Sequence, residues 1–231
     1  MLPFTVCPVG DTGLLVSFEQ RIAQSVGAAV AALNARVAAA AIPGVVETVP
    51  AFATLLIFYD PLVTEYDAVA DAVQKLAQAP GSDTAAEEGR LVEIPVCYGG
   101  TFGPDLPFVA EHAGLTETEV IRLHAGRDYP IYMLGFLPGF PYLGGLDERL
   151  FTPRLASPRT AIPAGSVGIG GEQTGVYPIA SPGGWQLIGR TPLKLFDPSA
   201  GRLPYAAGDR IRFCPITQDE FDAIAQKEGT V

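Results

Sequence analysis

Cationic side chains are concentrated in one part of this chain. Residues 149–212 contain eight lysines and arginines but only three acids, whereas the whole chain of 231 residues has a formal net charge of −10. Most of these cations are arginines, and a planar guanidinium donates two parallel hydrogen bonds to one carboxylate or phosphate. The cluster predicts a binding site for a small anionic molecule, although for any single arginine a solvated surface ion pair is the simpler interpretation.

The candidate anion-binding residues lie in segments rich in glycine and proline. Two of the arginines each follow a proline, which restricts the backbone before them. Farther along, polar and aromatic side chains stand among glycines, which let a ligand approach main-chain amides closely. The predicted anion-binding residues are Arg154, Arg159, Gln173, Tyr177, Ser181, Trp185, Arg190 and Lys194. Arg202 lies outside the segment rich in glycine and proline and is expected to contribute little.

A second candidate surface is the loop sequence MLGFLPGFPYLGG, which begins at Met133. Its aromatic residues Phe136, Phe140 and Tyr142 alternate with glycine and proline, so the loop presents large rings outside regular secondary structure. Exposed aromatic patches commonly mark interaction surfaces, and we predict that these three residues contact a partner protein. The alternative is that at least two of the rings plug the mouth of a β-barrel.

None of these segments contains a recognisable catalytic motif. GIGGEQTG lacks the GK[ST] ending of a phosphate-binding loop, and Ser181 has no neighbouring histidine. The two histidines, His112 and His124, belong to helical patterns and are predicted to be packed or capping residues. The three cysteines lie in apolar runs and are predicted to be buried thiols, and no metal site is expected. The catalytic residues therefore stay unknown.

The elements that must position these residues fall into two predicted domains. Residues 1–78 contain an apolar strand, a helical face from Ile22 to Val37, two further strands and a second helical pattern. This order predicts a small α+β domain of the split βαβ type, whose simplest role is that of a scaffold. Residues 79–89 lack large apolar side chains and are predicted to be a linker.

Residues 90–231 are predicted to form a mainly β domain. Strand patterns near its two ends flank two short helices, the second of which begins with a capping box of Thr116 and Glu119. Between Met133 and Pro192, 12 of 60 residues are glycine and 8 are proline, with short apolar segments between them. Short strands joined by turns are typical of a closed or partly closed β-barrel.

Composition and charge argue against several classes of function. A net charge of −10 repels polyanions, so nucleic acid is not expected as a partner. No run approaches the roughly 20 apolar residues of a membrane-spanning helix, and the N-terminus lacks the basic region and apolar core of a signal peptide. We therefore expect a cytoplasmic protein that binds neither nucleic acid nor a membrane.

The chain resembles a known protein family over nearly its whole length. The resemblance rests first on residues 132–198, YMLGFLPGFPYLGGLDERLFTPRLASPRTAIPAGSVGIGGEQTGVYPIASPGGWQLIGRTPLKLFDP. The same family pattern is followed by PVCYGGTFGPDL, EVIRLHAG, GDRIRFCPI and, near the N-terminus, GDTGLLVSFEQ. The family contains the B subunit of 5-oxoprolinase, the KipI sporulation kinase inhibitor and allophanate hydrolase subunit 1.

This resemblance implies a cyclophilin-like β-barrel after the small α+β domain. It also implies two partners. One is a second cyclophilin-like protein of the type of KipA or the C subunit of 5-oxoprolinase, and the other is the A subunit, which is of the LamB/YcsF type. The assembled enzyme would cleave 5-oxo-L-proline to L-glutamate with ATP, Mg²⁺ and water. The resemblance implies that ATP and Mg²⁺ act at the level of the complex and that this chain alone binds neither and is inactive.

Two other functions are compatible with the resemblance. One is a KipI-like inhibitor of a sensor histidine kinase, and the other is half of a carboxyltransferase of the urea and allophanate pathway. A neighbouring gene for the second cyclophilin-like subunit is the cheapest discriminating observation. A biotin carboxylase encoded alongside would favour the carboxyltransferase.

Overall fold

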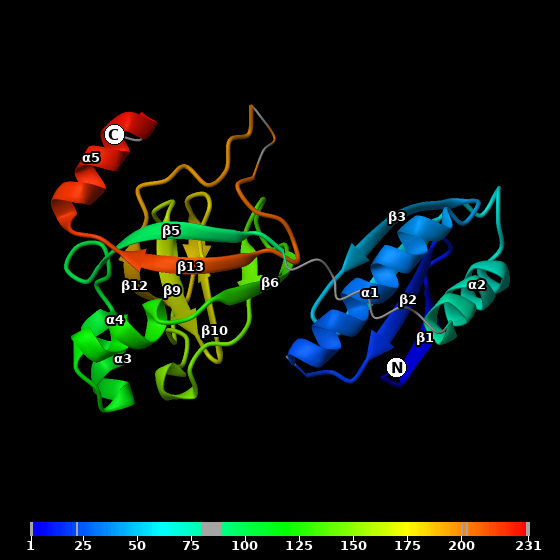
Figure 1. Cartoon of the computed structure of the whole chain (residues 1–231), viewed down its shortest axis with the longest axis horizontal. Coiled ribbons are helices and arrows are strands. Elements are labelled where there is room, and N and C mark those ends of the chain that lie inside the picture. The colour runs from blue at the N-terminus through cyan, green and yellow to red at the C-terminus, as the bar shows by residue number, and fades with distance from the viewer. Residues whose placement is uncertain (1, 22, 80–88, 200, 202, 230–231) are drawn as a thin grey trace. The chain divides into compact units, whose positions relative to one another are not determined.

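The computed structural model describes residues 2–21, 23–79, 89–199, 201 and 203–229. The chain divides into two compact units, Met1–Glu88 and Gly89–Val231 (Figure 1). Each unit has a hydrophobic core of its own. The predicted linker, residues 79–89, lies almost entirely outside the described residues. Within the described ranges, no helix has both the length and the apolar character needed to cross a membrane.

The first unit is a four-stranded antiparallel sheet packed against two helices (Figure 1). Its elements are β1 (Phe4–Val9), β2 (Gly13–Phe18), α1 (Gln24–Ala40), β3 (Val45–Pro50), β4 (Thr54–Tyr59) and α2 (Tyr66–Gln78). The sheet order is β1-β2-β4-β3, and both β2 and β3 pair antiparallel with β4. Strands β2 and β3 therefore run parallel, with β4 between them and α1 as their crossover, which is a split βαβ arrangement.

The core of the first unit follows from the periodicity of its elements. Alternate residues of β2 and β4 point to one face of the sheet, and α1 covers that face with an apolar stripe at helical spacing. The buried hydrophobic residues of these three elements, within the described side chains, are Leu14, Val16, Phe18, Val26, Val30, Leu33, Val37, Leu55, Ile57 and Tyr59. Ile22, which was predicted to begin the helical stripe, lies outside the described residues.

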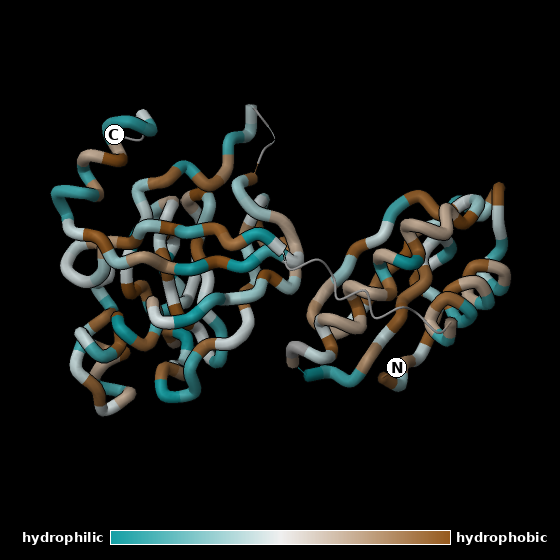
Figure 2. The backbone as a smooth tube through the Cα atoms, in the orientation of Figure 1, coloured by the Kyte–Doolittle hydropathy of each residue, from teal (hydrophilic) through white to brown (hydrophobic). Residues whose placement is uncertain are grey.

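The second unit contains a closed seven-stranded β-barrel, which confirms the predicted mainly β barrel. Its strands are β5 (Leu91–Tyr98), β6 (Tyr129–Leu134), β7 (Pro141–Leu143), β9 (Ser166–Gly170), β10 (Gln173–Val176), β12 (Gln186–Arg190) and β13 (Arg210–Pro215). Their order around the barrel is β10-β7-β6-β13-β5-β12-β9. Strands β5 and β13 are parallel neighbours. Figure 2 shows polar and apolar residues alternating along β13, as a wall with an apolar inner face requires.

The remaining elements of the second unit connect or cover the barrel (Figure 1). They are α3 (Leu106–Ala113), α4 (Glu117–Ala125), η1 (Glu148–Leu150), β8 (Arg159–Ile162), β11 (Ser181–Gly183) and α5 (Gln218–Glu228). Strands β8 and β11 pair as a two-stranded ribbon. The predicted capping box of α4 is confirmed, because Thr116 Oγ1 accepts from the Glu119 N–H and Glu119 accepts from the Thr116 N–H.

The barrel interior contains one fully buried histidine. The His124 ring lies between the Tyr98 hydroxyl, 2.8 Å from Nδ1, and Thr174 Oγ1, 2.8 Å from Nε2. It also stacks on Phe213 with ring centroids 4.8 Å apart. Burial lowers the pKa of His124 to about 3, so its ring is neutral at physiological pH. The prediction that His124 is a packed histidine is confirmed; His112 lies at the surface, stacked on Phe108.

The prediction of three buried thiols is correct only in part. All three cysteines are free, with Cys97 buried, Cys214 half-buried and Cys7 exposed. Cys7 lies on the edge strand β1, where it alternates with Val6. Val6 packs against the core, and Cys7 therefore points to the opposite, uncovered face of the sheet. An apolar run does not by itself tell which of two alternating residues is buried.

Candidate functional site

The outer face of β9 and β10 is made of backbone because its residues are largely glycine. A Cβ atom at Gly170 would lie 2.5 Å from the indole Nε1 of Trp185, and one at Gly175 would lie 3.1 Å from both Phe140 and Trp185. Both distances are shorter than ordinary contact, so side chains at these positions would displace the rings. Glycine therefore lets the aromatic rings lie directly on the barrel wall.

The rings that lie on this wall form a small hydrophobic cluster, the Trp185 cluster. Its buried members are Phe140, Ile162, Tyr177, Trp185 and Leu187. The ring of Phe140 meets those of Tyr177 and Trp185 edge to face, at centroid distances of 5.3 and 5.6 Å. Edge-to-face packing is a favoured aromatic geometry. Burial raises the pKa of Tyr177, so its hydroxyl keeps its proton near neutral pH.

The structure separates the three aromatic residues of the predicted partner surface. Phe140 is 2% exposed at the centre of the Trp185 cluster, so the prediction that it contacts a partner is wrong. The reason is that its ring fills the space above Gly175. Phe136 is 66% exposed, and its backbone has φ +63°, a left-handed conformation that is uncommon for a bulky residue. Tyr142 is half-buried, with its ring 5.2 Å from that of Phe140.

Two arginines border the Trp185 cluster, but their environments differ. The Arg154 side chain is exposed, and its Cζ lies 5.8 Å from the centroid of the Trp185 ring, which is within cation–π range. Among the residues that the structure describes, no carboxylate pairs with Arg154. Arg159 is instead held by Asp105, with Nη2 2.7 Å from Oδ1. Of these two arginines, Arg154 is therefore the one whose guanidinium has no carboxylate partner in the described part of the chain.

Two further predicted residues lie near the Trp185 cluster, Gln173 on the barrel strand β10 and Ser181 on β11, where it pairs with Ile162 of the cluster. Gln173 is opposite Gly170 in the β9–β10 pair and two residues before Gly175, so its side chain leaves the outer face of the wall. Its Nε2 atom is buried and has no hydrogen-bond partner within the described part of the chain, which is unusual for an amide donor. Ser181 is buried on β11, and its hydroxyl donates to the Pro182 carbonyl at 3.1 Å.

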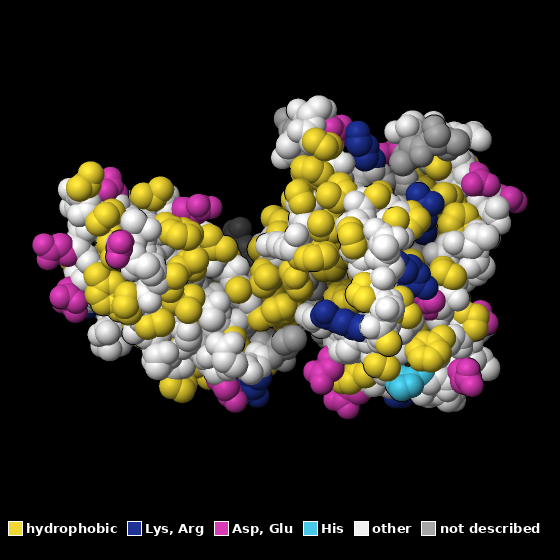
Figure 3. All heavy atoms as spheres, turned by 180° about the vertical axis from the view of Figure 1, so that it is seen from behind, with side chains coloured by type: hydrophobic (Ala, Val, Ile, Leu, Met, Phe, Trp, Pro, Cys, Tyr) yellow, Lys and Arg dark blue, Asp and Glu magenta, His cyan; other side chains and the backbone are white. Residues whose placement is uncertain are grey.

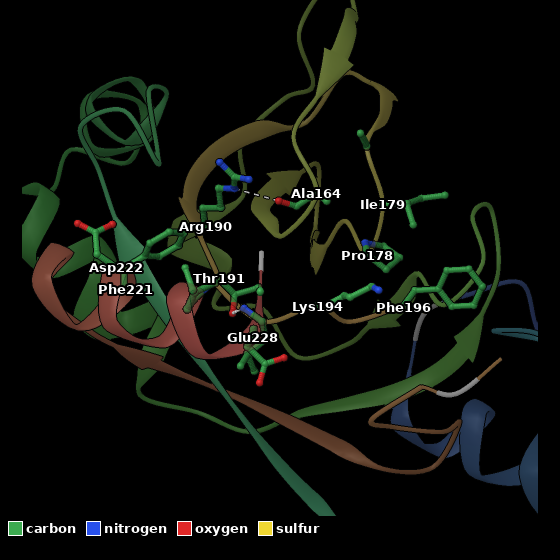
Figure 4. Close-up of a pocket in the computed structure, with 15 residues that line it drawn as sticks. Ala164, Pro178, Ile179, Arg190, Thr191, Lys194, Phe196, Phe221, Asp222 and Glu228 are labelled. Carbon is green, nitrogen blue, oxygen red and sulfur yellow. Dashed lines mark hydrogen bonds between the residues drawn. The ribbon is translucent and has the colours of Figure 1, made fainter. Parts of the chain in front are cut away.

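The last two predicted anion-binding residues, Arg190 and Lys194, lie at a separate cavity and not at the Trp185 cluster. Arg190 and Lys194 line a cavity of about 570 Å³ beside α5, and Figure 4 shows both side chains on its wall. Arg190 Nε donates to the Ala164 carbonyl at 2.9 Å, and Lys194 Nζ bonds Asp197 at 2.9 Å. As far as the described residues go, the walls of this cavity contain none of the other six predicted anion-binding residues. The structure thus divides the predicted set into a group around Trp185 and a pair at the cavity.

The charge pattern of the second unit agrees with the sequence. On the face seen in Figure 3, several Lys and Arg side chains lie among apolar side chains. Asp105 was not predicted, although it forms the bond that holds Arg159. The sequence offered one signal, since an Asp before an apolar helical pattern is a typical N-cap residue. That signal indicates a helix start and gives no sign of the contact with Arg159.

Comparisons with known proteins place the chain in a family. Residues 4–205 match the model of the carboxyltransferase domain, subdomain C and D, and the chain belongs to this family. It is 43% identical to the B subunit of 5-oxoprolinase from Bacillus subtilis, over 96% of both chains. It is also 49% identical to the B subunit of 5-oxoprolinase from Escherichia coli O157:H7, over 81% of both chains. The resemblance found in the sequence is therefore confirmed.

The fold also matches a larger enzyme of known structure. Urea carboxylase of Kluyveromyces lactis superposes with a TM-score of 0.77, although only 20% of aligned residues are identical. The match covers 97% of this chain and 23% of that enzyme. At this identity the likeness concerns the fold alone, and the chain matches one segment of a longer protein.

Proposed function

We propose that this chain is the B subunit of an ATP-dependent 5-oxoprolinase, which cleaves 5-oxo-L-proline to L-glutamate. The observation that carries the proposal is its identity to the B subunit of the Bacillus subtilis 5-oxoprolinase along 96% of both chains. A match that spans both chains supports an equivalent role in the complex and not merely a shared domain. The barrel is proposed to be of the cyclophilin-like type.

The outer face around Trp185 is the proposed contribution of this chain to the substrate site. The substrate has one carboxylate and a flat lactam ring, which need a cation beside an apolar surface. Arg154 supplies a cation with free donors, and Trp185 supplies the surface below it. Gln173 adds a buried amide donor that has no hydrogen-bond partner among the described residues. Phosphorylation of the lactam oxygen creates a further anionic group that such donors stabilise.

ATP and Mg²⁺ are assigned to the complex. Within the described part of this chain, no group of three or more His, Cys, Asp and Glu side chains is placed to hold a metal ion. Binding roles are proposed for the residues of this chain.

The proposed partners are a second cyclophilin-like subunit, together with a LamB/YcsF-type protein. The B-subunit designation of the relatives supports an assembly of several chains. Phe136 and Tyr142 are the proposed contact for the second cyclophilin-like subunit, because Phe136 is a largely exposed ring at a strained backbone position.

Reconstitution tests this function. The purified chain is incubated with 5-oxoproline, ATP and Mg²⁺, alone and with the other two subunits, and glutamate and ADP are measured. We expect product only in the complete mixture. Turnover by the chain alone, or a complete mixture without activity, would contradict the proposal.

A carboxyltransferase role is the second candidate, because the matching family model is that of a carboxyltransferase domain. It predicts transfer of a carboxyl group from carboxybiotin to a urea-derived amide when a biotin carboxylase is added. The same preparation distinguishes the two, since 5-oxoproline cleavage requires no biotin. Inhibition of a sensor histidine kinase stays a prediction.

A further inference from the structure

Asp105 occupies the N-cap position of α3 but does not cap it. Asp is among the strongest N-cap residues because its carboxylate accepts from the free N–H groups of the first turn. In this structure no side-chain hydrogen bond caps α3. The carboxylate is turned toward the Trp185 cluster. It therefore makes contacts there and does not accept hydrogen bonds from the first turn of α3.

The contacts of Asp105 tie it to the strand that follows Trp185. Its Oδ2 accepts from the Leu187 N–H at 2.6 Å, and its own N–H donates to the Leu187 carbonyl at 2.9 Å. The preceding segment is equally close, since a Cβ atom at Gly103 would collide with the Ile188 carbonyl. The start of α3 is therefore fixed against β12.

The other carboxylate oxygen of Asp105 holds Arg159. The Arg159 Nη2 lies 2.7 Å from Oδ1, and Arg159 Nη1 lies 3.4 Å from the Trp185 carbonyl. The two side chains are only 14% and 30% exposed, so solvent screens this pair less than it screens a surface pair. Arg159 thus bridges Asp105 and the backbone of Trp185.

We propose that Asp105 is a positioning residue that fixes Arg159 and Trp185, and so prepares the surface on which Arg154 binds the substrate carboxylate. The two arginines then have different roles. The Arg159 guanidinium is bound to Asp105 and supports the position of Trp185, whereas the Arg154 guanidinium can donate hydrogen bonds to the ligand. The part of this inference that concerns substrate rests on the proposed function.

The chain offers a specific probe, because Trp185 is its single tryptophan. Its fluorescence reports on this cluster in the full chain, without partners or activity. Asp105→Asn removes the charge that holds Arg159, and we expect a red-shifted Trp185 emission as water reaches the loosened indole. In the reconstituted enzyme we expect KM for 5-oxoproline to rise at least fivefold while kcat changes less than twofold.

Asp128→Asn is the matched control. Asp128 also holds an arginine, with Oδ1 2.7 Å and Oδ2 3.0 Å from the guanidinium of Arg212 on β13. This variant should leave Trp185 emission and KM unchanged. If Asp105 had a merely structural role, Asp105→Asn and Asp128→Asn would have the same effects. Both would, for example, lower the melting temperature and leave the Trp185 emission of the folded chain unchanged.

Arg159→Gln completes the test, since it breaks the same pair but keeps the bond from Asp105 to Leu187. If Asp105 acts through Arg159, the double variant Asp105→Asn with Arg159→Gln is no worse than the more affected single variant. Additive effects, or unchanged emission and KM in both single variants, would overturn the inference. A wild-type mixture without activity would overturn the proposed function instead, while the emission shifts still decide the positioning role.

Discussion

The two faces of the wall formed by β9 and β10 show how one pair of strands serves two different purposes. On the inside, Val167, Ile169 and Val176 pack into the main core. On the outside, Gly170 and Gly175 leave the backbone bare, and aromatic rings from distant segments cover it. The inner face is filled by its own side chains, whereas the outer face is a platform for residues brought from elsewhere. Glycine on a strand thus creates a surface for other side chains as well as flexibility.

The largest expected effect is a loss of stability, and it should distinguish Phe140 in the Trp185 cluster from Phe136 in the exposed part of the same loop. Phe140→Ser should destabilise the second unit by about 3 kcal/mol or more, because it empties the centre of the Trp185 cluster and buries a hydroxyl. Phe136→Ser should leave stability nearly unchanged, because that ring is mostly exposed. Urea unfolding followed by circular dichroism measures both. Equal losses would mean that the loop is one structural unit.

Acid should destabilise the second unit because His124 is buried there as a neutral ring. Its folded-state pKa of about 3 is below the unfolded value of about 6.5, so the unfolded chain binds the proton more tightly. Above pH 6.5 this histidine therefore does not reduce the stability of the fold. As the pH decreases from 6.5 toward 3, the free energy of unfolding falls. Between pH 7.5 and 4.5 this histidine should lower the free energy of unfolding by roughly 3 kcal/mol.

The pH effect is tested by urea unfolding at both pH values. His124→Gln should show a smaller loss of stability on acidification than the wild type, although it begins from a lower value. His112→Gln is the control and should keep the wild-type pH dependence, because that side chain lies at the surface. The same pH dependence in all three proteins would show that His124 is not the group that titrates.

Gly170→Ala tests whether the bare outer wall positions the rings. The added Cβ would lie 2.5 Å from the Trp185 indole, and displacing the ring should cost roughly 1–3 kcal/mol and shift Trp185 emission. Gly184→Ala is the control next to Trp185, since its Cβ would have its nearest neighbour at 3.6 Å, an ordinary contact. Unchanged emission in Gly170→Ala would show that the ring keeps its environment and that Gly170 does not position it.

The smallest effect in free energy concerns function. Arg154→Ala should lower kcat/KM of the reconstituted enzyme about tenfold, or ~1.4 kcal/mol, with stability unchanged. Arg159→Ala should cause a similar loss. Arg122→Ala, which removes an exposed cation from α4, should have no effect. If Arg190→Ala causes the larger loss, the substrate anion binds at the cavity beside α5 and not at the Trp185 face. Arg202, the control suggested by the sequence, lies outside the described residues.

The sequence by itself determined the local elements of this protein and its family. The capping box of Thr116 and Glu119 and the turn-rich segment of the barrel are local patterns, and short-range physics alone produces them. The family was also readable, because long motifs keep their residue order.

Only the tertiary structure decided which of the singled-out side chains meet. Arg154 and Trp185 are 31 positions apart and lie together, whereas Arg190, five positions after Trp185, lies at a different cavity. Asp105 reaches Arg159 across 54 positions, a contact for which the sequence has no local signal. The physical reason is that barrel closure sets these distances: register and side-chain alternation turn neighbours in sequence to opposite faces and bring distant segments onto one.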